Sequence, residues 1–132
     1  MAKARDIGVD VQGPKTDCSD PYCPFHGGFS VRGQLIEGQV VSTKMERSAR
    51  VQREYLRYVP KYERYEKRTR SYNVHAPPCL NVQVGDRVKI MECRPLSKTI
   101  SFVVIETKRG MLKLTADDAT APVAKEIKEV TE

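Results

Sequence analysis

The chain has 132 residues, 39% hydrophobic and 30% charged, a composition that allows one domain with a small core. It contains no run of eighteen apolar residues and no apolar segment near its start, so we expect neither a membrane span nor a secretory signal. The formal net charge is +6 and there are four cysteines. Without a secretory signal, cysteines favour free thiols or metal ligands over disulfides. We therefore expect a basic cytoplasmic protein.

Residues 1–28 are predicted to form an irregular N-terminal extension, because seven glycines and prolines interrupt any regular element. This extension has little apolar surface with which to fold, but it carries potential metal ligands. The spacing of Cys18, Cys23 and His26 is compatible with a structural zinc, and Cys79, far along the chain, is the natural fourth ligand. Cys93 is expected to be a small buried hydrophobe. The alternative is that the thiols are incidental and that a binding partner orders the extension.

The sequence pattern changes at Phe29, after which segments typical of β-strands begin. Extended runs are predicted at residues 34–45, 49–59, 67–75, 87–93 and 101–107. Gly38 inside the first run predicts a bulge or a sharp bend. The last run is apolar enough to be buried on both faces. Five short strands with few helical signals predict an all-β domain over residues 29–107, folded as a five-stranded OB-fold barrel with long loops.

Two further segments need an interpretation. Tyr55, Tyr58, Tyr62 and Tyr65 fall at helical spacing, but Pro60 in their midst argues against a single long helix. Residues 108–132 hold five basic and five acidic residues, and we expect a charged C-terminal tail with a short helix after Pro122. The acidic residues of this tail are poor RNA ligands, so a neighbouring protein is its expected partner.

Positive charge is concentrated between Lys44 and Arg70, where the sequence has ten Lys or Arg and four Glu. This segment alone carries a net charge of +6, equal to that of the whole chain, and it also contains four of the six tyrosines. Cations neutralise phosphates and release counterions, while tyrosine rings offer faces to unstacked bases. The segment is therefore predicted to bind RNA.

Five segments together resemble a known family. They are CPFHGGFSVRGQ (23–34), GQVVSTKM (38–45), YVPKYERYEKR (58–68), VHAPPC (74–79) and VGDRVKIMECRPLSKTISFVVIE (84–106). The set closely resembles the small-subunit ribosomal protein family seventeen in its archaeal form. The resemblance implies an OB-fold barrel without catalytic activity that binds the 5′ domain of 16S ribosomal RNA directly and clamps RNA helices during assembly. It also implies neighbouring small-subunit proteins as partners and no small-molecule substrate.

The residues expected to contact RNA lie in the basic segment and in the connection between the last two strands, a loop that OB folds commonly use for ligands. They are Lys44, Arg47, Arg50, Arg53, Lys61, Arg64, Lys67, Arg68, Arg70, His75, Arg94, Ser97, Lys98 and Thr99. His75 is expected to bond either a phosphate or a carbonyl. For the tyrosines between Tyr58 and Tyr65, packing and base stacking both stay open.

The alternative function is a free OB-fold protein that binds single-stranded RNA. An enzyme is disfavoured because the chain has two histidines and no nucleophile or phosphate-loop motif.

Overall fold

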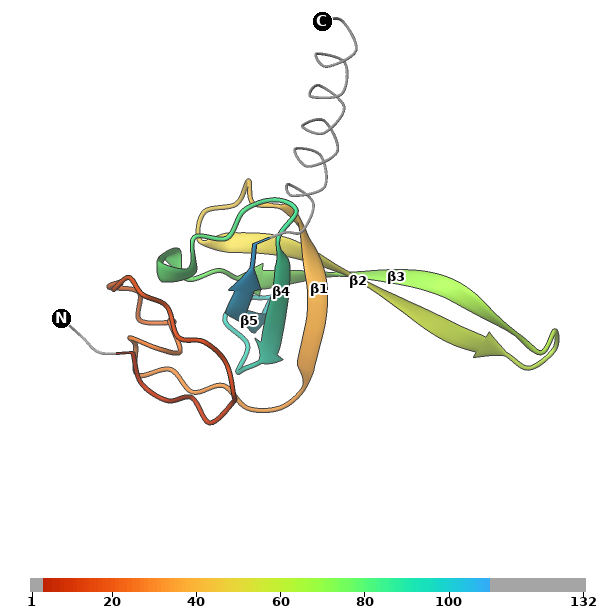
Figure 1. Cartoon of the computed structure of the whole chain (residues 1–132), viewed down its shortest axis with the longest axis horizontal. Coiled ribbons are helices and arrows are strands. Elements are labelled where there is room, and N and C mark those ends of the chain that lie inside the picture. The colour runs from red at the N-terminus through yellow and green to blue at the C-terminus, as the bar shows by residue number, and fades with distance from the viewer. Residues whose placement is uncertain (1–3, 110–132) are drawn as a thin grey trace, which may run out of the picture.

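The computed structural model describes residues 4–109, and its regular structure is almost entirely β-strand (Figure 1). The strands are β1 (Leu35–Ser42), β2 (Ser48–Val59), β3 (Arg64–His75), β4 (Arg87–Glu92) and β5 (Ile100–Lys108), with one short 3₁₀ helix, η1 (Pro78–Leu80), after β3. They close into a barrel in the order β1-β2-β3-β5-β4. Only the β3–β5 pair is parallel. The prediction of an all-β, five-stranded OB-fold barrel is confirmed.

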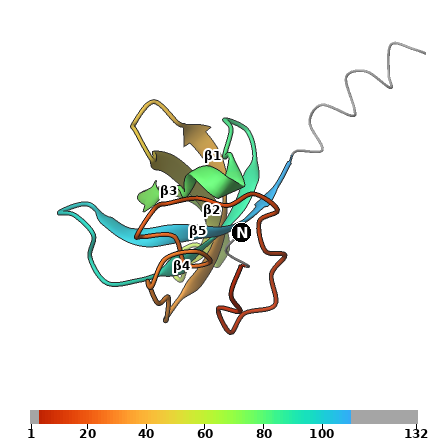
Figure 2. The same ribbon diagram turned by 90° about the vertical axis from the view of Figure 1, so that its left-hand side faces the viewer.

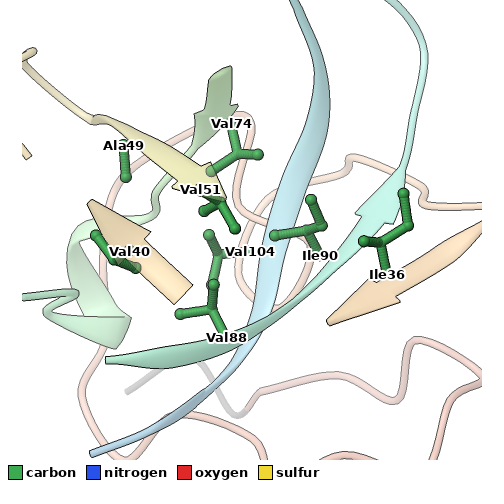
Figure 3. Packing of buried hydrophobic residues seen from close by; sticks show 8 residues of the cluster. All are labelled: Ile36, Val40, Ala49, Val51, Val74, Val88, Ile90 and Val104. Carbon is green, nitrogen blue, oxygen red and sulfur yellow. The ribbon is translucent and has the colours of Figure 1, made fainter. Parts of the chain in front are cut away.

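The barrel is filled by aliphatic side chains that alternate along each strand with outward-facing residues. The cluster consists of Ile36, Val40, Ala49, Val51, Val74, Val88, Ile90 and Val104 (Figure 3). Every strand contributes at least one member, and all eight are at most 2% exposed. The core is therefore small but closed on all sides by strands.

A second cluster lies between the barrel and the N-terminal segment. Val103 and Ile105 point away from Val104, yet all three are fully buried. Their cover includes Phe29 and, from the start of the chain, Ile7 and Val11. Figure 2 shows the N-terminal segment lying across the barrel, and Figure 1 shows it on the side opposite to the long β2–β3 hairpin. The prediction that both faces of β5 are buried is thus confirmed.

The N-terminal segment has no strand or helix between residues 4 and 28, as predicted. It folds back on itself through the Arg5 side chain, which donates to the carbonyls of Pro24 and Phe29. The boundary predicted at residue 28 stays a prediction. Apart from residues 108 and 109, the predicted tail and its helix lie outside the described residues. Within residues 4–109, no helix combines the length and apolarity needed to cross a bilayer.

The bulge predicted at Gly38 lies elsewhere in β1. The ladder shifts between Val40 and Ser42, so the bulge of β1 lies beyond the glycine, which pairs regularly with Val88. A Cβ atom at Gly38 would lie 2.5 Å from Cγ1 of Val51 and 2.9 Å from the Gln52 carbonyl oxygen. The glycine therefore permits the close approach of β2 at the point where β1 changes partner from β4 to β2.

The hairpin of β2 and β3 is longer than predicted. The two strands pair in register from Ser48 with His75 to Val59 with Arg64, and the outer part projects from the barrel (Figure 1). The connection expected over residues 60–66 is thus shorter than predicted, because β3 begins at Arg64 and only Pro60–Glu63 form the turn. Because the tyrosine-containing segment forms β2, a turn and β3, the alternative of a single long helix there is excluded. Residues 53–70, the part beyond the buried Val51, are called the ribbon below.

We expect Gly38→Ala to lower the free energy of unfolding by about 1–3 kcal/mol, because the added methyl group clashes with side chain and backbone of β2. Gly28→Ala is the matched control, since nothing lies within 4 Å of a Cβ there. The control is expected to leave stability unchanged or to raise it by up to about 1 kcal/mol. Urea denaturation measures both, and equal losses would contradict the close approach.

Candidate nucleic-acid interface and metal centre

Three thiols and one imidazole converge beside the barrel. The ligand atoms of Cys18, Cys23, His26 and Cys79 all lie within 4.8 Å of one another. Nδ1 of His26 is 3.3 Å from Sγ of Cys18 and 3.5 Å from Sγ of Cys23, whose sulfur is 3.6 Å from that of Cys79. Ligands around tetrahedral zinc are separated by about 3.6–3.8 Å, given bonds of about 2.0–2.3 Å. The four residues therefore form a group that could hold a metal ion.

Local backbone structure brings these ligands together. The Gly27 amide donates to the Cys23 carbonyl at 2.9 Å, a turn that places Cys23 and His26 on the same side. A Cβ atom at Gly27 would lie 2.4 Å from the Pro21 carbonyl oxygen, so only glycine fits this turn. Cys79 comes from η1, and its carbonyl accepts a bond of 2.8 Å from the Thr16 hydroxyl. The N-terminal segment and the β3–β4 connection thus meet at this cluster.

The His26 ring is oriented by its second nitrogen. Nδ1 faces the thiols, while Nε2 lies 3.5 Å from a carboxylate oxygen of Asp17. The side chain is only 2% exposed, so the ring has little freedom to turn. Metal-binding histidines commonly donate their other N–H to a carboxylate, which fixes the tautomer. Asp17 supplies the carboxylate near Nε2, although Nε2 makes no hydrogen bond among the described residues. The sequence analysis did not identify Asp17 because no spacing rule pairs it with His26.

The cysteine thiols shift one another's pKa values. The Cys79 thiol contacts the Cys23 sulfur, and this hydrogen bond lowers the pKa of Cys23 to about 4. The same contact, reinforced by burial, raises the pKa of Cys79. Burial raises the pKa of Cys18 as well. Ionisation of one thiol therefore disfavours ionisation of the next, and a bound cation would relieve this because it stabilises every thiolate at once.

A second contact fastens the N-terminal segment to the barrel. Oδ2 of Asp20 lies 2.6 Å from Nε2 of His75, at the end of β3, and both residues are buried. The other carboxylate oxygen accepts the Tyr22 amide at 3.1 Å. His75 was predicted to bond a phosphate or a carbonyl. Its Nε2 lies against a carboxylate, because the N-terminal segment covers the end of β3, and a contact of His75 with RNA stays a prediction.

The β4–β5 loop is also tied to the N-terminal segment. The Arg94 guanidinium lies 5.8 Å from the ring centroid of Tyr22 and 5.3 Å from that of Phe29, within the range of cation–π attraction. Oγ of Ser97 accepts the backbone amides of Thr99 and Ile100, which shapes the turn. Lys98 and Thr99 are exposed. The loop is thus preformed, with Arg94 partly committed to packing.

The other predicted RNA-contacting residues fall into two separate places. Lys44 and Arg47 lie exposed in the β1–β2 turn, and the remaining cations lie on the β2–β3 hairpin. The hairpin members are Arg50, Arg53, Lys61, Arg64, Lys67, Arg68 and Arg70. The turn and the tip of the hairpin stand at opposite ends of the twelve-residue β2, about 40 Å apart. The predicted residues do not form a single patch.

Comparisons with known proteins agree with this architecture. A family model described as Ribosomal protein S17 matches residues 38–106. The small ribosomal subunit protein uS17 of Methanospirillum hungatei is 59% identical over 107 residues, which cover 81% of this chain and 99% of that protein. The uS17 protein of Thermoplasma volcanium is 55% identical over 104 residues, covering 79% of this chain and 95% of its own length. The chain belongs to the ribosomal protein S17 family.

Membership of the ribosomal protein S17 family confirms the resemblance found in the sequence, including its archaeal form. The family is a structural one, and the prediction that the chain is not an enzyme is therefore confirmed. Cys93 is buried in the cluster around Phe29, away from the other thiols, as predicted. The sequence analysis missed Asp20, because its partner His75 lies 55 residues away and no motif joins the two.

We expect Asp20→Ala to lower the free energy of unfolding by at least about 2 kcal/mol, because His75 and the Tyr22 amide lose their buried partner. Asp10→Ala, at an exposed position of the same segment, is expected to change stability by about 0.5 kcal/mol or less. Urea denaturation measures the difference, and hydrogen exchange of residues 18–29 reports whether the segment detaches. Equal stability of the two variants would show that the Asp20–His75 contact is unimportant.

Proposed function

We propose that this member of the ribosomal protein S17 family is a structural constituent of the small ribosomal subunit in the cytoplasm. It binds the 5′ domain of 16S ribosomal RNA directly, beside neighbouring small-subunit proteins, and holds RNA helices together. The observation that carries the proposal is the ribbon, a projecting two-stranded element with seven Lys or Arg and three Glu. Such an element can reach into folded RNA that the barrel itself cannot enter.

The charges of the ribbon support phosphate binding. Among the residues that the structure describes, only Lys67 and Arg68 of the ribbon's cations pair with a carboxylate. The cations left without such a partner are Arg53, Arg57, Lys61, Arg64 and Arg70. Unpaired cations on a narrow projection attract phosphates and release counterions on binding. Lys44, Arg47 and Lys98 would add contacts from two loops of the barrel.

The alternative of a free carrier of single-stranded RNA requires aromatic rings displayed on the barrel wall. Tyr72 instead packs against the core, with its ring 5.2 Å from that of Phe102. Tyr58, Tyr62 and Tyr65 stand on the ribbon, away from the wall. This distribution favours a clamp on folded RNA over a track for an extended strand.

The purified chain is expected to bind the folded 5′ domain of 16S ribosomal RNA more than tenfold tighter than an unstructured oligonucleotide at matched salt. Because about six phosphates or more are neutralised, log affinity should fall against log salt with a slope of magnitude about 5 or more. Filter binding or fluorescence anisotropy at several salt concentrations measures both quantities. Equal affinity for the two RNAs would favour the free carrier instead.

The N-terminal segment is proposed to hold one structural zinc through Cys18, Cys23, His26 and Cys79. The donor set of three sulfurs and one imidazole nitrogen is typical of closed structural zinc sites, and the separations between the ligand atoms suit it. The bound ion would cross-link two parts of the chain and would have no catalytic role. It would join the N-terminal segment to the β3–β4 connection and contribute folding free energy to a segment without regular secondary structure.

Cys79→Ala is expected to abolish stoichiometric zinc binding, because it removes the ligand that comes from the barrel side. Cys93→Ala is the matched control, since Cys93 is also buried but belongs to the cluster around Phe29. Elemental analysis of the wild type should give about one zinc per chain, and the control should keep it. Limited proteolysis should cut the N-terminal segment of Cys79→Ala faster than that of Cys93→Ala. Equal zinc content in the two variants would refute the site.

A further inference from the structure

The register of the ribbon sorts its side chains onto two different faces. Residues directly opposite each other in an antiparallel pair share a face, and successive residues alternate between faces. Arg53 is opposite Arg70, Tyr55 is opposite Arg68, and Tyr58 is opposite Tyr65. The interleaved cations and tyrosines of the sequence are thereby separated in space. Each face has its own chemistry.

One face continues the barrel interior outward from Val51. Beyond Val51 it carries five arginines, together with Tyr55, Val59 and Glu66. The arginines are Arg53, Arg57, Arg64, Arg68 and Arg70. A single carboxylate, that of Glu66, lies among them and pairs with Arg68. We call this the arginine face, and its excess of four positive charges suits a phosphate backbone.

The other face carries no net charge and exposes aliphatic and aromatic side chains. Its two charged residues, Glu54 and Lys67, pair with each other at 2.9 Å. Thr69 lies opposite Glu54, and Leu56, Tyr58 and Tyr65 complete this face toward the tip. Leu56, Tyr58 and Tyr65 have exposed fractions of 68%, 48% and 68%. The two tyrosine rings have centroids 5.3 Å apart and are inclined at 57°, so each leaves ring surface open to solvent. We call this the tyrosine face.

We propose that the ribbon is a two-sided wedge in ribosomal RNA, with the arginine face on phosphate backbone and the tyrosine face against unpaired nucleotides that stack on Tyr58 and Tyr65. The proposal rests on the proposed function, since it assigns the two faces of the same RNA-binding element. The single cation of the tyrosine face, Lys67, is paired with Glu54, so this face offers no net positive charge to a phosphate. Exposed rings beside an aliphatic side chain offer what an unstacked base requires.

A protein partner fits the tyrosine face less well. A specific protein interface buries about 800 Å² on each partner, and an aromatic side chain supplies at most about 150–250 Å². One leucine and two tyrosines on a strip two strands wide therefore fall short of a stable protein contact. A stacked base needs only one ring, and such a stack contributes affinity by itself. The size of the patch thus favours nucleotides.

The test compares substitutions on the two faces in binding of the full chain to the folded 5′ domain across a range of salt. Arg57→Gln should weaken binding and reduce the magnitude of the salt slope by about 1. Tyr65→Ala should weaken binding by about fivefold to a hundredfold and leave the slope unchanged. Tyr65→Phe, which keeps the ring, should bind like the wild type. Tyr65 is exposed, so thermal unfolding should be the same for all chains.

Chemical probing of the RNA identifies the nucleotides that stack on the tyrosine face. At least one unpaired nucleotide, reactive in free RNA, should be protected by the wild type and by Arg57→Gln but not by Tyr65→Ala. Unchanged affinity and protection with Tyr65→Ala would overturn the two-sided assignment, even though the wild type still binds the RNA with a steep salt dependence. Failure of the wild type to prefer folded RNA would instead overturn the proposed function itself.

Discussion

The pairing register of β2 with β3 is the constraint on which the rest of the structure depends. Inside the barrel it directs Ala49, Val51 and Val74 into the core. Outside the barrel the same alternation separates the arginines from Leu56, Tyr58 and Tyr65. A slip of one residue would move every side chain to the opposite face, so the hydrophobic core fixes the register of the ribbon as well. Folding and the chemistry of the binding surface are therefore coupled through one strand pair.

The N-terminal segment has a complementary role on the other side of the barrel. It covers Val103 and Ile105, which would otherwise expose apolar surface, and it binds His75 through Asp20. The cluster of three cysteines and His26 adds a third attachment, to η1. The attachments involve different chemistry, namely apolar burial, a buried hydrogen bond and potential metal ligation. Together they allow a segment without regular structure to pack in a defined way.

Much of this architecture could be predicted from the sequence. Extended, apolar-rich runs predicted the five strands, and the spacing of Cys18, Cys23 and His26 identified the ligand cluster with Cys79. Three features could not be predicted because they depend on tertiary contacts. The role of Gly38 needs the position of Val51, and the partner of His75 comes from a distant irregular segment. The two faces of the ribbon require the register of its strands, which charge counts and tyrosine spacing do not contain.

Photo-crosslinking from two adjacent positions tests the account most directly. Leu56 and Arg57 are neighbours in β2 but lie on opposite faces of the ribbon. A photoreactive amino acid is placed at each position in turn, and the crosslinked nucleotides of the folded 5′ domain are mapped by primer extension. The account predicts two separate sets of nucleotides, and those crosslinked from position 56 should be unpaired. One common set from both positions would contradict it.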